Sequence, residues 1–255
     1  MSVINTTEWL ETTPNQYEIC EKLTPYFSKM NAGDISNYLH SFGMYKRSPA
    51  SQDWIDVIKD KRLLHFINDE KKKLKSEWNG PSVPIFVFPV DVHNRKIEME
   101  YRGRSGLAFH DKLFLFLSQD VKKEDIKSLL THEYHHVCRL AAITKPEKDF
   151  TIIDTMIMEG LAENAVREKL GEEAVAEWTK LYHPDQCDRF LERIILPQKK
   201  TTRQDQKFTQ LMFGTGFYPK MLGYAVGYHL VKNYMEKTNK ATKALLGIKA
   251  EDFIE

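Results

Sequence analysis

The segment LLTHEYHHVCRL places three histidines and one glutamate in the five positions His132–His136, in a 255-residue chain that has nine histidines in all. In an α-helix, side chains four residues apart lie on one face, so His132 and His136 can reach the same cation. Glu133 would then lie beside a water on that cation, where a carboxylate can act as general base. The spacing therefore predicts a metal site with hydrolytic chemistry.

The polarity of this segment also favours a metal site. At ~100° per residue, four apolar side chains form one sector of the helix: Ile126, Leu129, Val137 and Leu140. Glu133 falls inside that sector, His132 and His136 stand at its edge, and His135 points away from it. A carboxylate in an apolar stripe is costly to bury without a charge or hydrogen-bond partner, and a metal site supplies one. The alternative is a chance HExxH pattern on a solvated helix face.

A second segment, TIIDTMIMEGLAENAVREKLG, offers a further metal ligand. A catalytic zinc takes three protein ligands and keeps one position open. Glu159 and Glu163 lie one turn apart in the middle of an apolar helical stripe, so Glu159 is the candidate third ligand and Glu163 can accept an imidazole N–H. The alternative is a helix turned so that both glutamates are solvated, which would expose its apolar stripe.

HEYHH followed by EGLAE resembles the gluzincin clan of metallopeptidases, and the pattern from Val83 to Met235 resembles the family of predicted zinc-dependent proteases called DUF2268. The resemblance implies that His132, His136 and Glu159 bind one zinc ion and that Glu133 is the base. A parallel with thermolysin-like enzymes implies that Glu163 holds a ligand imidazole. Those enzymes differ in having a shorter gap before the third ligand and an aspartate at the position of Glu163.

In the same clan, an edge strand beside the active-site helix binds the substrate backbone in an extended form. The candidate here is RSGLAFHDKLFLFLS, in which Gly106 and Ala108 are small enough to let a peptide approach closely. An ordinary buried strand is the alternative.

The segment KMLGYAVGYHLVKNY carries two tyrosines, Tyr224 and Tyr228, on one helical face. Either hydroxyl could donate to the oxyanion that develops during hydrolysis. Gly223 and Gly227 would permit close helix approach, and the resemblance to DUF2268 favours Tyr224. The alternative is that both tyrosines are core or interface aromatics.

Elements of an α+β, zincin-like metallopeptidase fold would position these residues. Residues 1–80 predict a helical amino-terminal region, in which the apolar spacing predicts one continuous helix over 53–78. Residues 81–171 predict the zincin-like catalytic core, with a small mixed sheet built from strands near 83–92, 96–101, 106–109 and 112–118 followed by two active-site helices. Residues 172–255 predict a helical carboxyl-terminal lobe, with helices over 172–182, 188–196 and 218–237.

Composition argues against several other kinds of partner and location. Thirty-seven basic and 36 acidic side chains nearly balance, which argues against a nucleic-acid or membrane-surface partner. The sequence shows neither a signal peptide nor a run of ~18 apolar residues, so we expect a cytoplasmic location. The three cysteines form no CxxC and are expected to be free thiols. Nothing in the pattern indicates an oligomeric state.

The sequence therefore predicts a zinc-dependent metallopeptidase that acts on peptide or protein substrates. One alternative is a catalytically inactive zincin-fold module with a metal-binding or regulatory role, although the intact Glu133 argues against it. Another is a ferritin-like di-iron oxidase, but that would need a second Glu-x-x-His motif and a four-helix bundle.

Overall fold

The computed structural model describes residues 3–13, 15–46, 51–94, 97 and 103–254. The chain divides into two compact units, Met1–Val137 and Cys138–Glu255, and the boundary lies within one long helix. Each unit has its own core.

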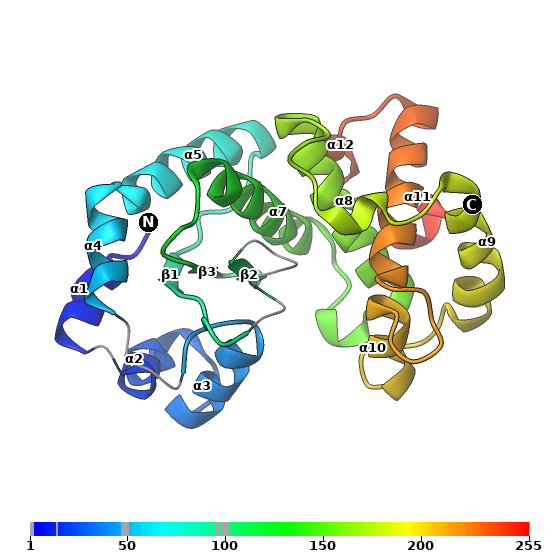
Figure 1. The fold of residues 1–255 in the computed structure, drawn as a ribbon. Coiled ribbons are helices and arrows are strands. Elements are labelled where there is room, and N and C mark those ends of the chain that lie inside the picture. Colours follow the sequence, from blue (N-terminus) through cyan, green and yellow to red (C-terminus); the bar gives the residue numbers. More distant parts are fainter. Residues whose placement is uncertain (1–2, 14, 47–50, 95–96, 98–102, 255) are drawn as a thin grey trace. The chain divides into compact units, whose positions relative to one another are not determined.

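The first unit places helices around a small sheet (Figure 1). Its helices are α1 (Thr6–Thr12), α2 (Gln16–Leu23), α3 (Ala32–Ser41), α4 (Gln52–Asp60) and α5 (Leu63–Trp78), and its strands are β1 (Ile85–Pro89), β2 (Arg104–Ala108) and β3 (Leu113–Leu117). Helix α7 (Lys123–Ala142) follows the sheet and continues into the second unit. The predicted combination of helices with a small mixed sheet is confirmed.

The sheet has the order β1-β3-β2, with β1 parallel and β2 antiparallel to β3. Both β1 and β3 are fully buried, which matches their nearly continuous apolar sequences IFVFP and LFLFL. Strand β2 is only half-buried and forms one edge of the sheet. The strand predicted at 96–101 lies outside the described residues except for Ile97.

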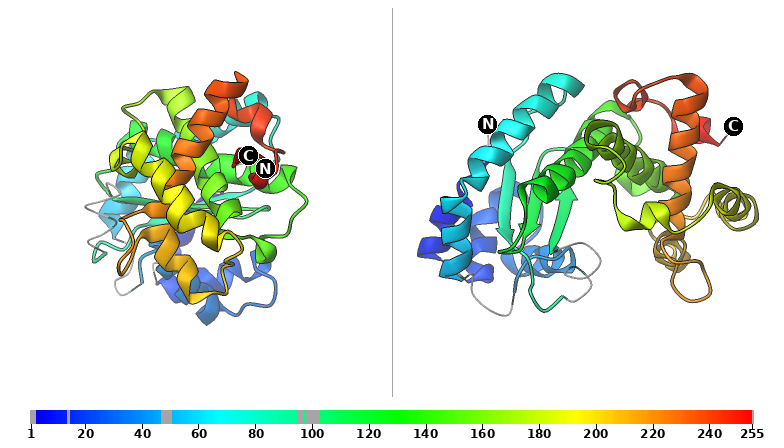
Figure 2. Two further views of the ribbon diagram at one scale, coloured as in Figure 1. Left: turned by 90° about the vertical axis from the view of Figure 1, so that its right-hand side faces the viewer. Right: turned by 45° about the horizontal axis from the view of Figure 1, so that its top comes forward.

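Side-chain alternation gives the sheet two different faces. Phe86 and Phe88 of β1 pair with Phe114 and Phe116 of β3, so all four aromatic rings lie on one face. Phe86 contacts Trp9 and Tyr26 of the amino-terminal helices, at ring distances of 6.1 and 4.8 Å. The opposite face is aliphatic, with Val87 paired to Leu115. Glu133 of α7 lies against this face at Gly106, and Figure 2 shows α7 beside the strands. The amino-terminal helices therefore complete the core on the aromatic face.

The amino-terminal segment also covers the β1 edge of the sheet. Val3 forms a parallel bridge with Ile85, and the Ile4 amide donates to the Ile85 carbonyl at 2.9 Å. The Trp54 indole donates to the Leu117 carbonyl at 2.8 Å. One edge of the sheet is thus closed by the protein itself.

Helix α7 is held by α5 as well as by the sheet. Trp78 stacks on Tyr134 with ring centroids 6.2 Å apart, and the Tyr134 hydroxyl donates to the Pro81 carbonyl at 2.8 Å. His135 is fully buried and meets the Trp78 ring edge-on at 5.1 Å. His135 therefore lies against α5, which supplies a second apolar surface for this helix.

The second unit contains α8 (Ile152–Leu170), α9 (Pro184–Phe190), α10 (Gln206–Phe213), α11 (Leu222–Thr238) and α12 (Thr242–Leu245). Helices α8 and α11 cross with their backbones in contact. A Cβ on Gly160 would lie 2.2 Å from the Gly227 carbonyl oxygen, and a Cβ on Gly227 would lie 2.1 Å from the Met156 oxygen. The predicted close approach at Gly227 is confirmed, and Gly223 makes a similar approach to Met212 of α10.

Several predicted helix boundaries were wrong. The continuous helix expected over 53–78 is two helices, because Arg62 takes a left-handed conformation with φ of 49°. The helix expected over 172–182 is only a 3-10 turn at Glu177–Lys180, and α10 was not predicted. No Gly or Pro stands at Arg62 or within the turn Glu177–Lys180, so neither feature has a local breaker residue.

Candidate metal centre

His132 and His136 lie one turn apart on α7 with their rings turned toward each other. Their Nε2 atoms are 3.0 Å apart and their ring centroids 4.6 Å apart, with ring planes at 89°. A tetrahedral zinc with Zn–N bonds of ~2.0–2.1 Å would separate two ligand nitrogens by ~3.3 Å. A small rotation of either ring reaches that separation, so the pair fits one cation.

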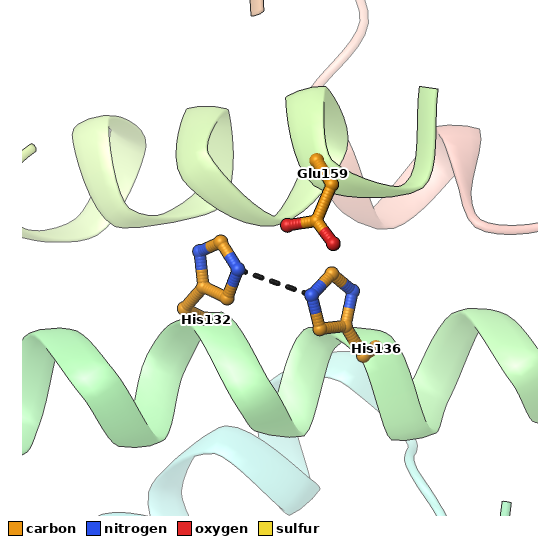
Figure 3. A group of neighbouring side chains, drawn as sticks. All are labelled: His132, His136 and Glu159. Atoms are coloured by element: carbon orange, nitrogen blue, oxygen red, sulfur yellow. Dashed lines mark hydrogen bonds between the residues drawn. The ribbon is translucent and has the colours of Figure 1, made fainter. Parts of the chain in front are cut away.

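Glu159 on α8 completes a group of three possible ligands. One ligand atom from each of His132, His136 and Glu159 lies within 4.8 Å of the others, and the side chains point toward one another (Figure 3). Two imidazole nitrogens and one carboxylate oxygen are a donor set typical of catalytic zinc. It is the one such group among the residues that the structure describes.

Packing within the second unit fixes the helical turn that carries Glu159. Gly160, the next residue, is where α8 meets the backbone of α11. The Asn164 side chain, fully buried, donates to the Gly160 carbonyl at 2.8 Å and to the Tyr228 carbonyl at 3.0 Å. Asn164 therefore joins α8 to α11 about one turn from Glu159, a role that was not predicted. Its position directly after EGLAE was the available signal.

Glu133 is buried, with 8% of its surface exposed, and its carboxylate lies against β2. A Cβ on Gly106 would lie 2.4 Å from Glu133 Cγ and 2.5 Å from both Cδ and Oε1. The absence of a side chain at Gly106 thus makes room for the Glu133 carboxylate. This space is therefore filled by Glu133 and not, as predicted, open to an approaching peptide.

The hydrogen-bond register of β2 determines which backbone groups face outward. The Phe109 amide donates to Lys112 O at 2.9 Å and the Ser118 amide to Gly103 O at 2.8 Å, so odd-numbered residues of β2 bond to β3. The N–H and C=O groups of Gly106 and Ala108 therefore point away from β3. In the described part of the chain no strand pairs with this edge.

Glu163 is buried, and its Oε1 accepts the Ala176 amide N–H at 2.6 Å. This bond fixes the segment that leads into Trp178, which packs edge-on against Tyr224 at 5.3 Å and Tyr228 at 6.2 Å. Glu163 therefore holds the Ala176 backbone, and its contact with a ligand imidazole stays a prediction. Trp178, which holds both candidate tyrosines, was not singled out from the sequence.

The two tyrosines differ in their surroundings. The Tyr228 hydroxyl is buried, and burial together with the nearby Glu172 raises its pKa. Tyr224 is only partly buried, against Trp178 and Phe213. The Tyr228 hydroxyl is thus buried away from solvent, whereas Tyr224 keeps part of its surface exposed.

The sequence profile of a family described as predicted Zn-dependent protease (DUF2268) matches residues 63–255. The chain belongs to this family. The match includes α5, the sheet, α7, α8 and α11, and it leaves out residues 1–62, so the helices α1–α4 lie outside it.

Two relatives come from Bacillus subtilis (strain 168). The chain is 44% identical to the uncharacterized protein YjaZ over 258 residues, covering 100% of this chain and 99% of YjaZ. It is 29% identical to the uncharacterized protein YjfC over 236 residues, covering 88% of this chain and 75% of YjfC. No solved structure matches the chain. Among the described helices, none combines the length and apolar character needed to cross a membrane.

Proposed function

We propose that the chain is a zinc-dependent metallopeptidase that hydrolyses peptide bonds. The observation that carries the proposal is the convergence of His132, His136 and Glu159, with Glu133 following directly on the same helix as His132. Membership of a family of predicted Zn-dependent proteases supports it. A bound zinc would polarise the scissile carbonyl and lower the pKa of a water toward ~7.

Residues of the chain would then transfer the proton, stabilise the oxyanion and orient a ligand. Glu133 accepts the proton of the attacking water at its carboxylate and passes it to the leaving amine. Its burial against Gly106 supports a fixed orientation for that carboxylate. Tyr224 donates its hydroxyl hydrogen to the developing oxyanion. Glu163 acts as a hydrogen-bond acceptor that orients a ligand imidazole.

The free edge of β2 would bind the substrate backbone. An extended peptide can pair with the outward N–H and C=O groups of Gly106 and Ala108, which adds a strand to the sheet. Because Gly106 abuts Glu133, a peptide bonded there passes next to the proposed base. This arrangement supports a peptide substrate over a compact small molecule.

Metal analysis of protein purified without added metal tests the ligand set. We expect about one zinc per chain, and His132→Ala, His136→Ala or Glu159→Ala should each remove most of it. His183→Ala is the matched control, because that side chain is 71% exposed and lies outside the group, so its zinc content should be unchanged. A Glu159→Ala protein that keeps its full zinc would refute the third ligand.

Cleavage of a broad peptide library tests the reaction. Glu133→Gln should keep the zinc and abolish turnover, because an amide fills the same space without accepting a proton. Undiminished cleavage by this variant would remove Glu133 as the base. An unsubstituted protein that binds zinc but cleaves nothing in the library would favour the inactive metal-binding module.

A further inference from the structure

A group of exposed and partly buried apolar side chains lies beside the free edge of β2, on the sheet face opposite Glu133. We call it the α3 patch, and it consists of Tyr38, Phe42, Leu107 and Phe109. Tyr38 and Phe42 are 36% and 37% exposed, although large aromatic side chains are usually buried more fully. Tyr38 contacts Phe42 at 5.1 Å and Phe109 at 6.1 Å between ring centroids.

A hydrogen bond and a ring contact connect the α3 patch to the edge strand and its surroundings. The Ser105 hydroxyl of β2 donates to the Phe42 carbonyl at the end of α3, at 2.7 Å. Phe109 follows β2 and packs edge-on against the buried Phe27 at 5.7 Å. These contacts fix the two exposed rings of α3 relative to the strand.

Alternation along a strand decides which side chains meet this patch. Gly106 lies on the α7 face, because a Cβ there would meet Glu133. Ser105 and Leu107 therefore lie on the other face, with the α3 patch. A peptide residue opposite Gly106 directs its side chain toward α7, whereas its two neighbours direct theirs toward the α3 patch.

We propose that the α3 patch selects substrates that carry apolar side chains at two positions separated by one residue, when the peptide binds the β2 edge in an extended form. This inference rests on the proposed peptidase function. It assigns selection of the substrate side chains to α3, which lies outside the 63–255 match to the family. The amino-terminal helices would thus add specificity to a site that the matched region builds.

The test is a binding measurement that needs no turnover. Two labelled eight-residue peptides of identical composition carry two phenylalanines in a polar background, either at positions i and i+2 or at positions i and i+1. Fluorescence anisotropy measures their Kd with the zinc-loaded Glu133→Gln protein, which leaves the peptides intact. We expect the i,i+2 peptide to bind roughly tenfold tighter, because only that spacing puts both rings on the α3 face.

The variant Tyr38→Ser/Phe42→Ser should lose this preference and keep its zinc content and melting temperature. Tyr17→Ser is the control, since Tyr17 is 51% exposed on α2 and should leave the preference unchanged. Equal Kd values for the two peptides, or a preference that survives in the double variant, would overturn the proposal. Dimerisation that the double variant abolishes would assign the patch to a second copy of the chain and would also overturn it.

Failure of the proposed function has a different signature. Absence of library cleavage by the zinc-loaded, unsubstituted protein would refute the metallopeptidase assignment, whereas the two Kd values of the Glu133→Gln protein do not depend on turnover. Library cleavage by the unsubstituted protein, together with equal Kd values for the two peptides, would refute the role of the α3 patch alone.

Discussion

Gly106→Ala tests whether the space occupied by the Glu133 carboxylate matters for catalysis. An alanine Cβ would lie 2.4–2.5 Å from three atoms of the Glu133 side chain. Carbon atoms in favourable contact lie ~3.5–4.0 Å apart, so the carboxylate must withdraw by roughly 1 Å. A misplacement of that size at a reacting group costs about 10²-fold in rate. We therefore expect kcat to fall by about 10² with zinc content unchanged.

The effect on stability should be small by comparison. Gly106 does not have a positive φ, so alanine fits its backbone and reduces the entropy of the unfolded chain, a gain of about 0.4–1 kcal/mol. Overpacking against Glu133 costs about 1–3 kcal/mol. The difference is about 1–2 kcal/mol, which corresponds to a fall in Tm of roughly 2–8 °C for a chain of this size.

Steady-state kinetics, zinc analysis and thermal melting of the same Gly106→Ala sample separate these effects. KM should change little, because the outward N–H and C=O groups at this position remain available to a peptide. Gly247→Ala is the matched control, since its added Cβ would meet only the Ala142 carbonyl oxygen, at 3.8 Å, and should alter neither rate nor stability. A Gly106→Ala enzyme with kcat within twofold of the unsubstituted enzyme would refute the reasoning.

Three further predictions follow from the second unit and from the thiols. Glu163→Ala should weaken zinc affinity by roughly ten- to a hundredfold, measured by competition with a chelator, and an unchanged affinity would restrict Glu163 to holding the Ala176 amide. Tyr224→Phe should lower kcat on the order of 10²–10³ with zinc retained, and a loss in Tyr228→Phe alone would transfer the role to that residue. Burial raises the pKa of Cys20 to about 12 and of Cys187 to about 11, so both stay protonated in the folded protein at pH values where unfolded thiols ionise. The contribution of these two buried thiols to the free energy of unfolding is therefore complete below pH ~8.5 and falls as the pH rises above it. Denaturant titrations at pH 8 and 10 would measure this fall. Rapid thiol labelling of the native protein at pH 8 would contradict the burial.

Local periodicity was enough to identify the candidate ligands. His132 and His136 share one face because four residues make about one helical turn, and this holds wherever the helix packs. Glu159 and Glu163 were found in the same way, from carboxylates that interrupt an apolar stripe on α8. Local rules were less useful for boundaries, since α4 and α5 are separated at Arg62, where no Gly or Pro marks a helix end.

Contacts between distant segments required the tertiary structure. The sequence singled out Gly106, but only the packing of β2 against α7 reveals that Glu133 fills the space above it. The free edge and its outward groups depend on the order β1-β3-β2, and the α3 patch depends on the Ser105 hydrogen bond to Phe42. Periodicity reports which face of an element is apolar, but it carries no information about which partner covers that face, because the partner is chosen by packing across the whole unit.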